Sequence, residues 1–236
     1  MPTPFEQYLT GDYLAHNPTW DIEDSPWKAD QVRRMLRIHG LDPHDIVEVG
    51  CGAGGVLAAL RTYFPDAGLV GYEIATDAAK FWAAHRTAGI RFVLGDFLAT
   101  NAHRFDVLLL LDVIEHLPNP FEFLQRLHGQ ADHYVFHIPL DLSASSVLRG
   151  QPLLHVRRQV GHIHYFTKDL ALSLLEECGF DVVDWFYTGA SLNSPNRSLK
   201  TRFSALARRL AYAFNKNFGV RLLGGETLLV LAKPFP

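Results

Sequence analysis

The sequence predicts an α/β fold in which helices cover both faces of a parallel sheet. Short apolar runs alternate with helix-patterned segments, which is typical of parallel strands joined by helical crossovers. The run Phe105–Leu111 is almost continuously apolar, as a central strand covered on both faces requires. The apolar run before Gly50 passes through glycines into a helical pattern, which predicts a strand, a tight turn and a helix.

Composition and charge narrow the class of protein. The chain has 236 residues, 48% of them hydrophobic, which suffices for the core of one large domain. The formal net charge of −3 gives no basic surplus for binding nucleic acid. The two cysteines, Cys51 and Cys178, argue against a disulfide framework. The N-terminus lacks the pattern of a signal peptide and no apolar run reaches membrane-spanning length, so we expect a soluble, cytoplasmic protein.

The first 40 residues are predicted to form an aromatic-rich segment and one helix. Ser25 as N-cap and Pro26 as the first helical residue predict where the helix starts, and Gly40 predicts its end. Lys28 falls in the first turn, where the helix dipole disfavours a cation. We predict an exposed lysine there; the alternative is that a local acid such as Asp24, or a ligand, holds it.

The glycine-rich stretch 47–55 predicts a nucleotide-type ligand site. Glycine permits positive φ and lets main-chain N–H groups approach an anion, and the following helix points its N-terminus at the loop. Two cofactor patterns fit the stretch. The dinucleotide pattern G-x-G-x-x-G is met by Gly50, Gly52 and Gly55. The pattern acid-x-G-x-G-x-G is met by Glu48, Gly50, Gly52 and Gly54.

The helix after the glycines is predicted to end at Pro65 and to be followed by a strand, Gly68–Tyr72. This strand ends in Glu73, at the distance from the first glycine where an acid accepts hydrogen bonds from both ribose hydroxyls. The next helix is predicted between a cap at Thr76-Asp77 and a stop at Gly89.

A third strand, Arg91–Leu94, runs into Gly95, Asp96 and Phe97. A carboxylate beside an aromatic ring at this point can accept a hydrogen bond from an adenine amino group while the ring covers the base. A plain turn acid is the alternative.

The central strand Phe105–Leu111 ends at a cluster of polar residues. We expect Asp112, Glu115 and His116 at the carboxyl edge of the sheet, where open α/β folds bind their ligands. Asn119 is predicted to cap the next helix. The side chains predicted to face the core from that helix are Phe121, Leu124 and Leu127.

The second half of the chain holds three more strands and two insertions. The strands are predicted at Tyr134–Ile138, Phe180–Tyr187 and Thr227–Leu231. The connection 139–166 is long enough to be functional or separately structured. Thr167 is predicted to cap a helix that ends at Gly179. Its core-facing side chains are predicted to be Leu170, Leu174 and Cys178.

A basic segment precedes the last strand. Residues 197–221 hold seven Lys or Arg and no Asp or Glu, and residues 198–214 place apolar side chains on one helical stripe. We favour a solvated helix face; a dock for an anionic substrate and a peripheral membrane contact are the alternatives.

Taken in order, these motifs resemble the class I methyltransferases that use S-adenosyl-L-methionine (SAM), over about residues 25–235. Within that class the chain is similar to the UbiE/UbiG-like and other small-molecule methyltransferases, in which the edge of the fourth strand often holds Glu-His, here Glu115 and His116. The resemblance implies a Rossmann-like seven-stranded sheet with an antiparallel last strand between the fifth and sixth. It also implies a methyltransferase domain at 41–236, with insertions at about 139–166 and 189–224, and residues 1–40 as a lid or cap.

The resemblance implies the cofactor-binding residues too. The methionine moiety would lie among Glu48, Gly50, Cys51, Gly52 and Gly54. The ribose would be held by Glu73, next to Ile74, and the adenine by Asp96 and Phe97. The methionyl amino group would contact Leu111 and Asp112.

Two other functions fit part of the sequence. An NAD-dependent oxidoreductase would explain the glycines and Glu73, but not Gly95-Asp96 or the terminal strand pair. A catalytically silent SAM-binding module is the second alternative, which turnover of any acceptor would exclude.

The predicted acceptor is a small molecule methylated at oxygen. A sugar, a nucleotide-linked compound or another anionic compound fits the basic insertions, and the oligomeric state is left open. A hydroxyl acceptor needs a base of near-neutral pKa, for which histidine is suited. The candidates are His116, His162, His137 and His164, with the first two preferred. A metal site built from His162 and His164 with His155 or His137 is possible by spacing, but we expect no metal.

Overall fold

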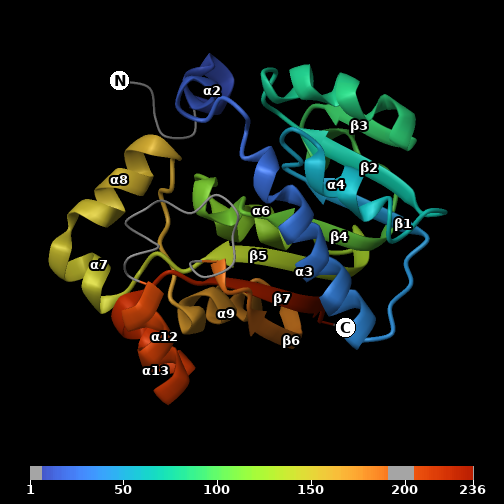
Figure 1. Ribbon diagram of the computed structural model, residues 1–236. Helices are drawn as coiled ribbons and strands as arrows, with labels where there is room; N and C mark the ends of the chain where they lie inside the picture. The colour runs from blue at the N-terminus through green and yellow to red at the C-terminus, as the bar shows by residue number, and fades with distance from the viewer. Residues whose placement is uncertain (1–6, 191–204, 236) are drawn as a thin grey trace.

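The computed structural model describes residues 7–190 and 205–235. Seven strands form one sheet in the order β3-β2-β1-β4-β5-β7-β6 (Figure 1). The strands are β1 (Asp45–Val49), β2 (Gly68–Glu73), β3 (Ile90–Leu94), β4 (Phe105–Leu111), β5 (Ala131–Pro139), β6 (Phe180–Tyr187) and β7 (Thr227–Pro234). Strand β7 pairs antiparallel with both β5 and β6, and the pairs among β1 to β5 are parallel. This confirms the predicted architecture and the place of the last strand.

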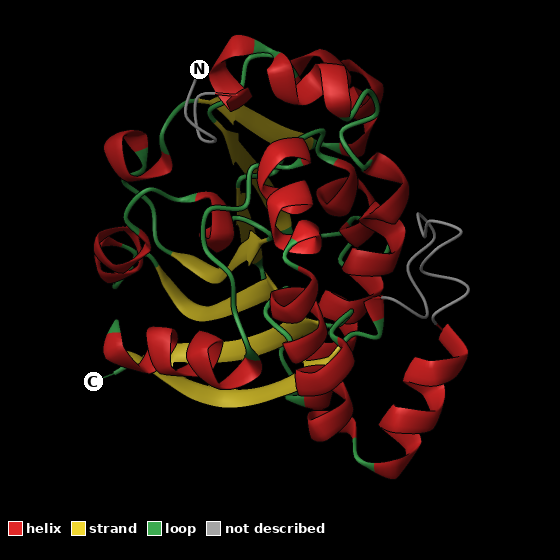
Figure 2. Ribbon diagram, turned by 90° about the vertical axis from the view of Figure 1, so that its left-hand side faces the viewer, coloured by secondary structure: helices red, strands yellow, loops and turns green. Residues whose placement is uncertain are grey.

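Helices cover both faces of the sheet (Figure 2). They are α1 (Gln7–Thr10), α2 (Asp12–His16), α3 (Ser25–Ile38), α4 (Gly55–Leu60), α5 (Phe97–Thr100), α6 (Pro120–Arg126), α7 (Ala144–Arg149), α8 (Gln151–Gln159), α9 (Lys168–Glu177), α12 (Ala205–Phe214) and α13 (Lys216–Leu223). The described residues also form three 3-10 segments: η1 (Ile22–Asp24), η2 (Ala78–Ala88) and η3 (Ile114–His116).

Alternate residues of the central strand, β4, pack into two hydrophobic cores, one on each face of the sheet. On one face Val107 and Leu109 of β4 belong to a cluster that includes Met35 of α3. On the other, Leu108 belongs to a cluster that includes Leu124 of α6. This two-sided burial explains why the strand sequence is apolar at nearly every position.

Several local predictions were wrong in detail. Ser25 is the first residue of α3 rather than its N-cap, which is Asp24. Helix α4 ends at Leu60, because Arg61–Phe64 turns away before Pro65. The segment before Gly89 is a 3-10 helix, and Asp77 makes no side-chain cap.

Two side chains predicted to face the core are exposed instead. Phe121 is 46% exposed and Leu170 is 52% exposed. Both lie in the first turn of a helix, α6 or α9, whereas Leu124 and Leu174, one turn later on the same helix face, are buried. The caps Asn119 and Thr167 were predicted correctly, since each accepts a hydrogen bond from the backbone of its helix.

The two insertions contain helices of their own. Helices α7 and α8 lie in the connection after β5, and α12 and α13 precede β7. The predicted helix 198–214 is described only from Ala205 onward, and its start lies outside the described residues. Cys51 and Cys178 are both buried and free. No helix within the described ranges has the length and apolarity needed to span a bilayer.

Candidate active site

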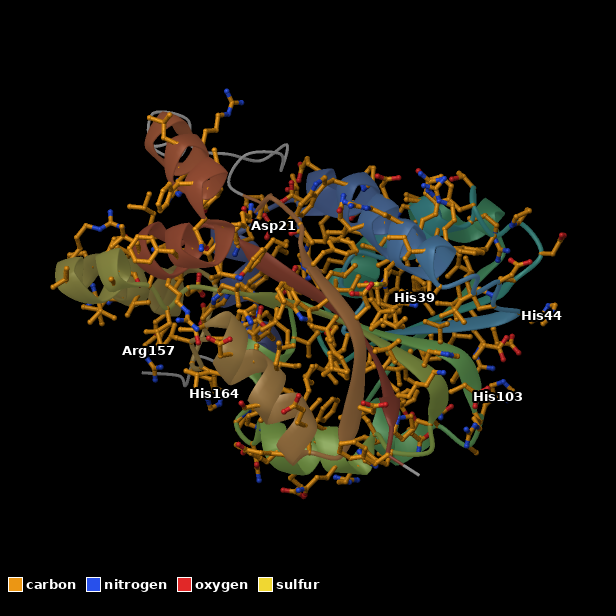
Figure 3. All side chains as sticks on the ribbon, turned by 90° about the horizontal axis from the view of Figure 1, so that it is seen from below. Asp21, His39, His44, His103, Arg157 and His164 are labelled. Carbon is orange, nitrogen blue, oxygen red and sulfur yellow. The ribbon has the colours of Figure 1, made fainter. Side chains whose placement is uncertain are left out.

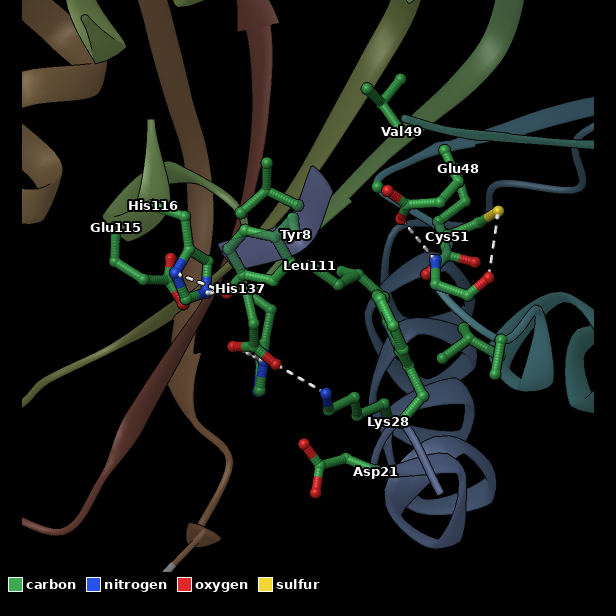
Figure 4. A pocket seen from close by; sticks show the side chains of 18 of the residues that line it. Tyr8, Asp21, Lys28, Glu48, Val49, Cys51, Leu111, Glu115, His116 and His137 are labelled. Carbon is green, nitrogen blue, oxygen red and sulfur yellow. Dashed lines mark hydrogen bonds and ion pairs between the residues drawn. The ribbon is translucent and has the colours of Figure 1, made fainter. Parts of the chain in front are cut away.

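A cavity of about 400 Å³ opens at the carboxyl edge of the sheet. Figure 4 shows Glu48 and Cys51 on one side of this cavity and Glu115 and His116 on the other. The predicted site residues that line it are Glu48, Gly50, Cys51, Gly52, Glu73, Ile74, Asp96, Phe97, Leu111, Asp112, His116, His137 and His162. The sequence therefore located most of the cavity wall.

The glycine loop follows β1 and takes a conformation that favours glycine. Gly50, Gly52 and Gly54 have φ of 77°, 51° and 81°. A Cβ on Gly52 would lie 2.7 Å from the indole of Trp20, and one on Gly50 would lie 2.6 Å from Val113. Side chains at these positions would therefore need both strained backbone and displaced neighbours. Gly54 does not line the cavity; its Cβ would meet Phe92 instead.

Glu73 fastens this loop to the end of β2. One carboxylate oxygen accepts the N–H of Gly52 at 2.9 Å, and the other accepts those of Ile74 at 2.8 Å and Ala75 at 2.9 Å. Burial raises the pKa of Glu73, and the three N–H groups oppose that shift. The side chain thus has a structural part in shaping the loop besides any contact with a ligand.

Glu48 is a buried carboxyl group with a free oxygen. Its side chain is 3% exposed, and its Oε2 has no hydrogen-bond partner among the described residues. Burial raises the pKa of Glu48 to about 8, against the opposing effect of Lys28. A buried oxygen without a partner costs free energy, which a donor on a bound ligand would offset.

Asp112 is already paired on both sides. Its Oδ2 lies 2.8 Å from Nζ of Lys28, and its Oδ1 lies 2.8 Å from Nδ1 of His137. Burial alone would raise the pKa of Asp112, but His137 and Lys28 outweigh it and hold the pKa well below its usual range. Lys28 is therefore not exposed, contrary to the prediction, but pairs with an acid at the carboxyl end of β4. Burial alone would lower the pKa of Lys28, but Asp112, with smaller contributions from Asp24 and Asp21, outweighs burial and raises it.

The adenine motif is only partly as predicted. Asp96 is exposed and caps α5, accepting the N–H of Leu98 at 2.9 Å. Phe97 is 2% exposed and packs edge-on against Tyr72, with ring centroids 5.0 Å apart. The Phe97 ring is therefore part of the core wall, because the chain turns into α5 at that residue.

His116 is held by the N-terminal segment. Its Nδ1 lies 3.0 Å from the hydroxyl of Tyr8, and this hydroxyl donates to the carbonyl of Val160 at 2.7 Å. The hydroxyl has one hydrogen, so it accepts from His116, whose Nδ1 lies nearer to it than Nε2, at 3.0 Å against 3.4 Å. Burial, with a smaller contribution from neighbouring His162, lowers the pKa of His116 to about 3, so the ring is neutral at physiological pH.

His162 is oriented by an acid that the sequence did not identify. Its Nδ1 lies 2.5 Å from Oδ2 of Asp141, and its Nε2 faces Oε1 of Glu115 at 3.9 Å. Burial alone would lower the pKa of His162, but Asp141 and Glu115 outweigh burial and raise it above the ordinary 6.5. An imidazole fixed by a carboxylate at Nδ1 presents Nε2 for proton transfer.

Glu115 lies beneath these two histidines. It is fully buried, and neither carboxylate oxygen has a hydrogen-bond partner among the described residues. Burial raises its pKa to about 8, against the opposing effect of His162. Ligand atoms of Glu115, His116 and His162 lie within 4.8 Å of one another, so a cation could reach all three.

His164 is not part of this group. Its Nε2 lies 2.9 Å from the carbonyl of Leu117, and it does not line the cavity. Only Ile163 separates it from His162 in the sequence, but His162 contacts Asp141 whereas His164 contacts the carbonyl of Leu117, so the two side chains do not share a site. Figure 3 labels His164 at the outer surface near Arg157.

The N-terminal segment covers the cavity. Tyr8, Tyr13, Trp20 and Asp21 line it, and Tyr13 donates to Asp21 at 3.2 Å. Trp20 and Asp21 have φ of 53° and 51°, a strained conformation for residues other than glycine. This bend places the indole of Trp20 against the glycine loop.

Three important side chains were not predicted as part of the site: Tyr8, Lys28 and Asp141. Lys28 reaches Asp112 from a helix 84 positions earlier, and nothing local signals such a pairing. Asp141 had a usable signal, since it follows the end of β5 at the same sheet edge as Asp112.

Comparisons with known proteins place this geometry in context. The profile of a family described as a methyltransferase domain matches residues 25–184. A ubiquinone biosynthesis O-methyltransferase of Roseobacter denitrificans is 27% identical over 158 residues, which cover 59% of this chain and 60% of that protein. A protein of the same description from Vibrio campbellii is 21% identical over 201 residues, covering 77% of this chain and 84% of the relative. The chain thus spans less than two thirds of the Roseobacter relative.

Solved structures share the fold. The plantazolicin methyltransferase in complex with a monoazolic desmethyl analogue and S-adenosyl-L-homocysteine (SAH) superposes with a TM-score of 0.65 at 18% identity, covering 98% of this chain and 94% of the other. The magnesium protoporphyrin IX methyltransferase from Synechocystis with bound SAH gives a TM-score of 0.58 at 16% identity, covering 89% and 83%.

Proposed function

This chain belongs to the methyltransferase-domain family, whose methyl donor is SAM, and we propose that it transfers the methyl group to an oxygen of a small molecule. The observation that carries the choice of oxygen is the pair His162 and Asp141. A hydroxyl must lose a proton during methylation, and an imidazole oriented by a carboxylate is suited to accept it. The NAD-dependent alternative falls away with the family match over residues 25–184.

The cavity fits SAM by two features of this chain. The glycine loop has main-chain N–H groups and no side chains at Gly50 and Gly52, where a Cβ would collide with neighbours. The free, buried oxygen of Glu48 calls for a donor, and the methionyl amino group of SAM is a cationic donor.

We assign the cofactor contacts accordingly. Glu48, rather than Asp112, would accept from the amino group, because both oxygens of Asp112 already have partners. Lys28 would be the cation nearest the carboxylate group. Glu73 would hold the ribose and Asp96 the adenine amino group, as the family resemblance implies. Phe97 would contribute to the wall beneath the base.

When bound, SAM supplies an electrophilic methyl group on a sulfonium. The residues of the chain would position the acceptor and manage its proton. His162 Nε2 would take the hydroxyl proton, while Asp141 keeps the imidazole in the required tautomer and stabilises the cation that forms. His116, neutral and fixed by Tyr8, would border the acceptor and exclude water. His137 would act through Asp112 as a positioning residue.

The part of the segment 1–40 that precedes α3 would act as a lid over this site, since α3 itself packs into the core with β4. Tyr8 bridges His116 and the carbonyl of Val160, so it joins the N-terminus to the segment that carries His162. Trp20 closes the same segment onto the glycine loop. The proposed methyltransferase domain then comprises α3 and residues 41–236 with its two insertions.

The experiment is a transfer assay with isotope-labelled SAM and a panel of small acceptors. Each hydroxyl compound, including sugars and nucleotide-linked sugars, is paired with the amine of the same skeleton. We expect label in the hydroxyl member of a pair and a product with a methyl ether by mass spectrometry. Transfer to the amines alone would overturn the assignment to oxygen, and SAM binding without any turnover would favour a non-catalytic module.

Removing metals should leave the activity unchanged. The proton acceptor in this proposal is His162, so no divalent ion is needed, although Glu115, His116 and His162 form a set that could bind one. We expect treatment with a chelator and dialysis to preserve the rate, and elemental analysis to find less than one equivalent of zinc, iron or manganese. Loss of activity that returns on adding one metal would assign these three residues as ligands instead.

A further inference from the structure

Six apolar side chains project from one end of the molecule. They lie on α7, α12 and α13 and include the two most exposed large apolar residues of the described chain, Phe214 at 90% and Leu148 at 87%. The set, called here the apolar end face, is Val147, Leu148, Leu210, Phe214, Phe218 and Leu222. Figures 1 and 3 both show these helices gathered with α8 at the same end.

Helices α12 and α13 carry these exposed side chains although each helix also has a side that packs against the rest of the protein. Gly219 and Val220 of α13 are buried, and Tyr212 of α12 donates to the carbonyl of Gly224 at 2.6 Å. Lys216 pairs with Glu226 at 2.5 Å. The helices are thus anchored by one side, and the side that carries Phe214 and Phe218 faces outward.

The same end is strongly basic. Among the described residues, 142–168 hold four Lys or Arg and 205–225 hold four more, with no Asp or Glu in either stretch. Three of these eight pair with acids just outside the stretches: Lys216 with Glu226, and Lys168 and Arg221 with Asp169. Arg149, Arg157, Arg158 and Arg209 are exposed. These four exposed arginines give this end a local excess of positive charge, although the whole chain has a formal net charge of −3.

Exposed phenylalanine and leucine surrounded by arginine is the composition of helices that lie in a membrane interface. A second copy of the chain would bring one positive face against another, which like-charge repulsion opposes. Nucleic acid would satisfy the arginines but leave the aliphatic side chains Val147, Leu148 and Leu210 exposed. An anionic bilayer meets both requirements.

We propose that the apolar end face docks onto an anionic lipid bilayer, with Phe214 and Leu148 entering the headgroup region and the arginines contacting lipid phosphates. Helix α8 leads directly to Val160 and His162, which line the cavity. Docking by this face would bring the acceptor side of the cavity close to the membrane. The inference does not depend on the proposed methyl transfer. It favours a peripheral membrane contact, which the sequence analysis gave as an alternative to a solvated helix face.

The test is sedimentation of the full chain with vesicles of phosphatidylcholine, alone or mixed with phosphatidylglycerol. We expect binding to the mixed vesicles only, weakened by salt. The double variant Leu148→Ser with Phe214→Ser should lower the partition coefficient about tenfold or more. The matched control is Ile38→Ser with Phe121→Ser, exposed at 54% and 46% outside this face, which should bind as the unaltered chain does.

A charge reversal separates the electrostatic part. Arg209→Glu should reduce binding to the mixed vesicles, whereas Arg91→Glu, an exposed arginine on β3, should not. Equal binding to both kinds of vesicle, or unchanged binding of the Leu148 and Phe214 variant, would overturn the proposal. So would a dimer in lipid-free solution that this variant dissociates, or tight binding to mixed-sequence DNA without binding to vesicles. Circular dichroism checks that each variant is folded.

Discussion

Replacing His162 with alanine lowers kcat by about 10²–10⁴-fold, the usual contribution of a general base. Among the described residues that line the cavity, two imidazoles have Nδ1 held by a carboxylate: His162 by Asp141 and His137 by Asp112. Of these two, only His162 has a carboxylate partner other than Asp112. The affinity for SAH should stay unchanged, since His162 lies across the cavity from the glycine loop. Steady-state kinetics with an active hydroxyl acceptor and calorimetry with SAH measure the two effects separately.

His164→Ala is the matched control, because it removes an imidazole two positions away that does not line the cavity. It should retain full activity. Equal losses of kcat in the two variants would mean that activity depends on the conformation of the segment that carries both histidines, and not on His162 as a base.

The pH dependence follows from the same pair. The protonated form of His162 cannot accept a proton, so kcat should fall as pH drops through a pKa above 6.5. In the D141N variant the largest interaction that raises this pKa is gone, and the inflection should move to lower pH. An inflection that stays in place would remove Asp141 from its positioning role.

Glu73→Ala weakens SAH binding by about 1–3 kcal/mol, because it leaves buried N–H groups without an acceptor and removes the proposed ribose contact. Three backbone N–H groups around the glycine loop depend on this carboxylate. Isothermal titration with SAH measures the loss, and thermal unfolding without ligand measures the effect on the fold.

Asp106→Ala is a close control for this effect. The Asp106 carboxylate also accepts two backbone N–H groups, from His44 at 2.6 Å and Asp45 at 3.2 Å, but at the opposite edge of the sheet. It should lower the unfolding temperature without changing SAH affinity. If Glu73→Ala behaves in the same way, Glu73 braces the loop and has no part in binding the ribose.

The fold was predictable because its signals are local. The bounds predicted for Phe105–Leu111 and Phe180–Tyr187 agree with β4 and β6. Strand β4 is apolar along nearly its whole length because it is buried on both faces, whereas β6 lies at the edge of the sheet and is mostly half-buried. The place of β7 came from family resemblance, because nothing within 227–231 says which strands lie beside it. Helix α13 was missed, since its apolar residues face outward as well as inward.

The site was predictable where the backbone forms it and less so where side chains from distant segments meet. Glycines at 50 and 52 signal their conformation directly, so the loop was located correctly. Asp112 looked free in the sequence, but Lys28 on α3 and His137 on β5 reach it only in the folded chain. Tyr8 contacts His116 across 108 positions, and no pattern in the sequence predicts such a contact.

The most direct test of the account is isothermal titration of the full chain with SAH and, separately, with NADH. The account predicts one SAH site per chain with a dissociation constant in the micromolar range, at about −8 kcal/mol, and no heat of binding for NADH. Binding of NADH at the same stoichiometry, with none for SAH, would contradict it.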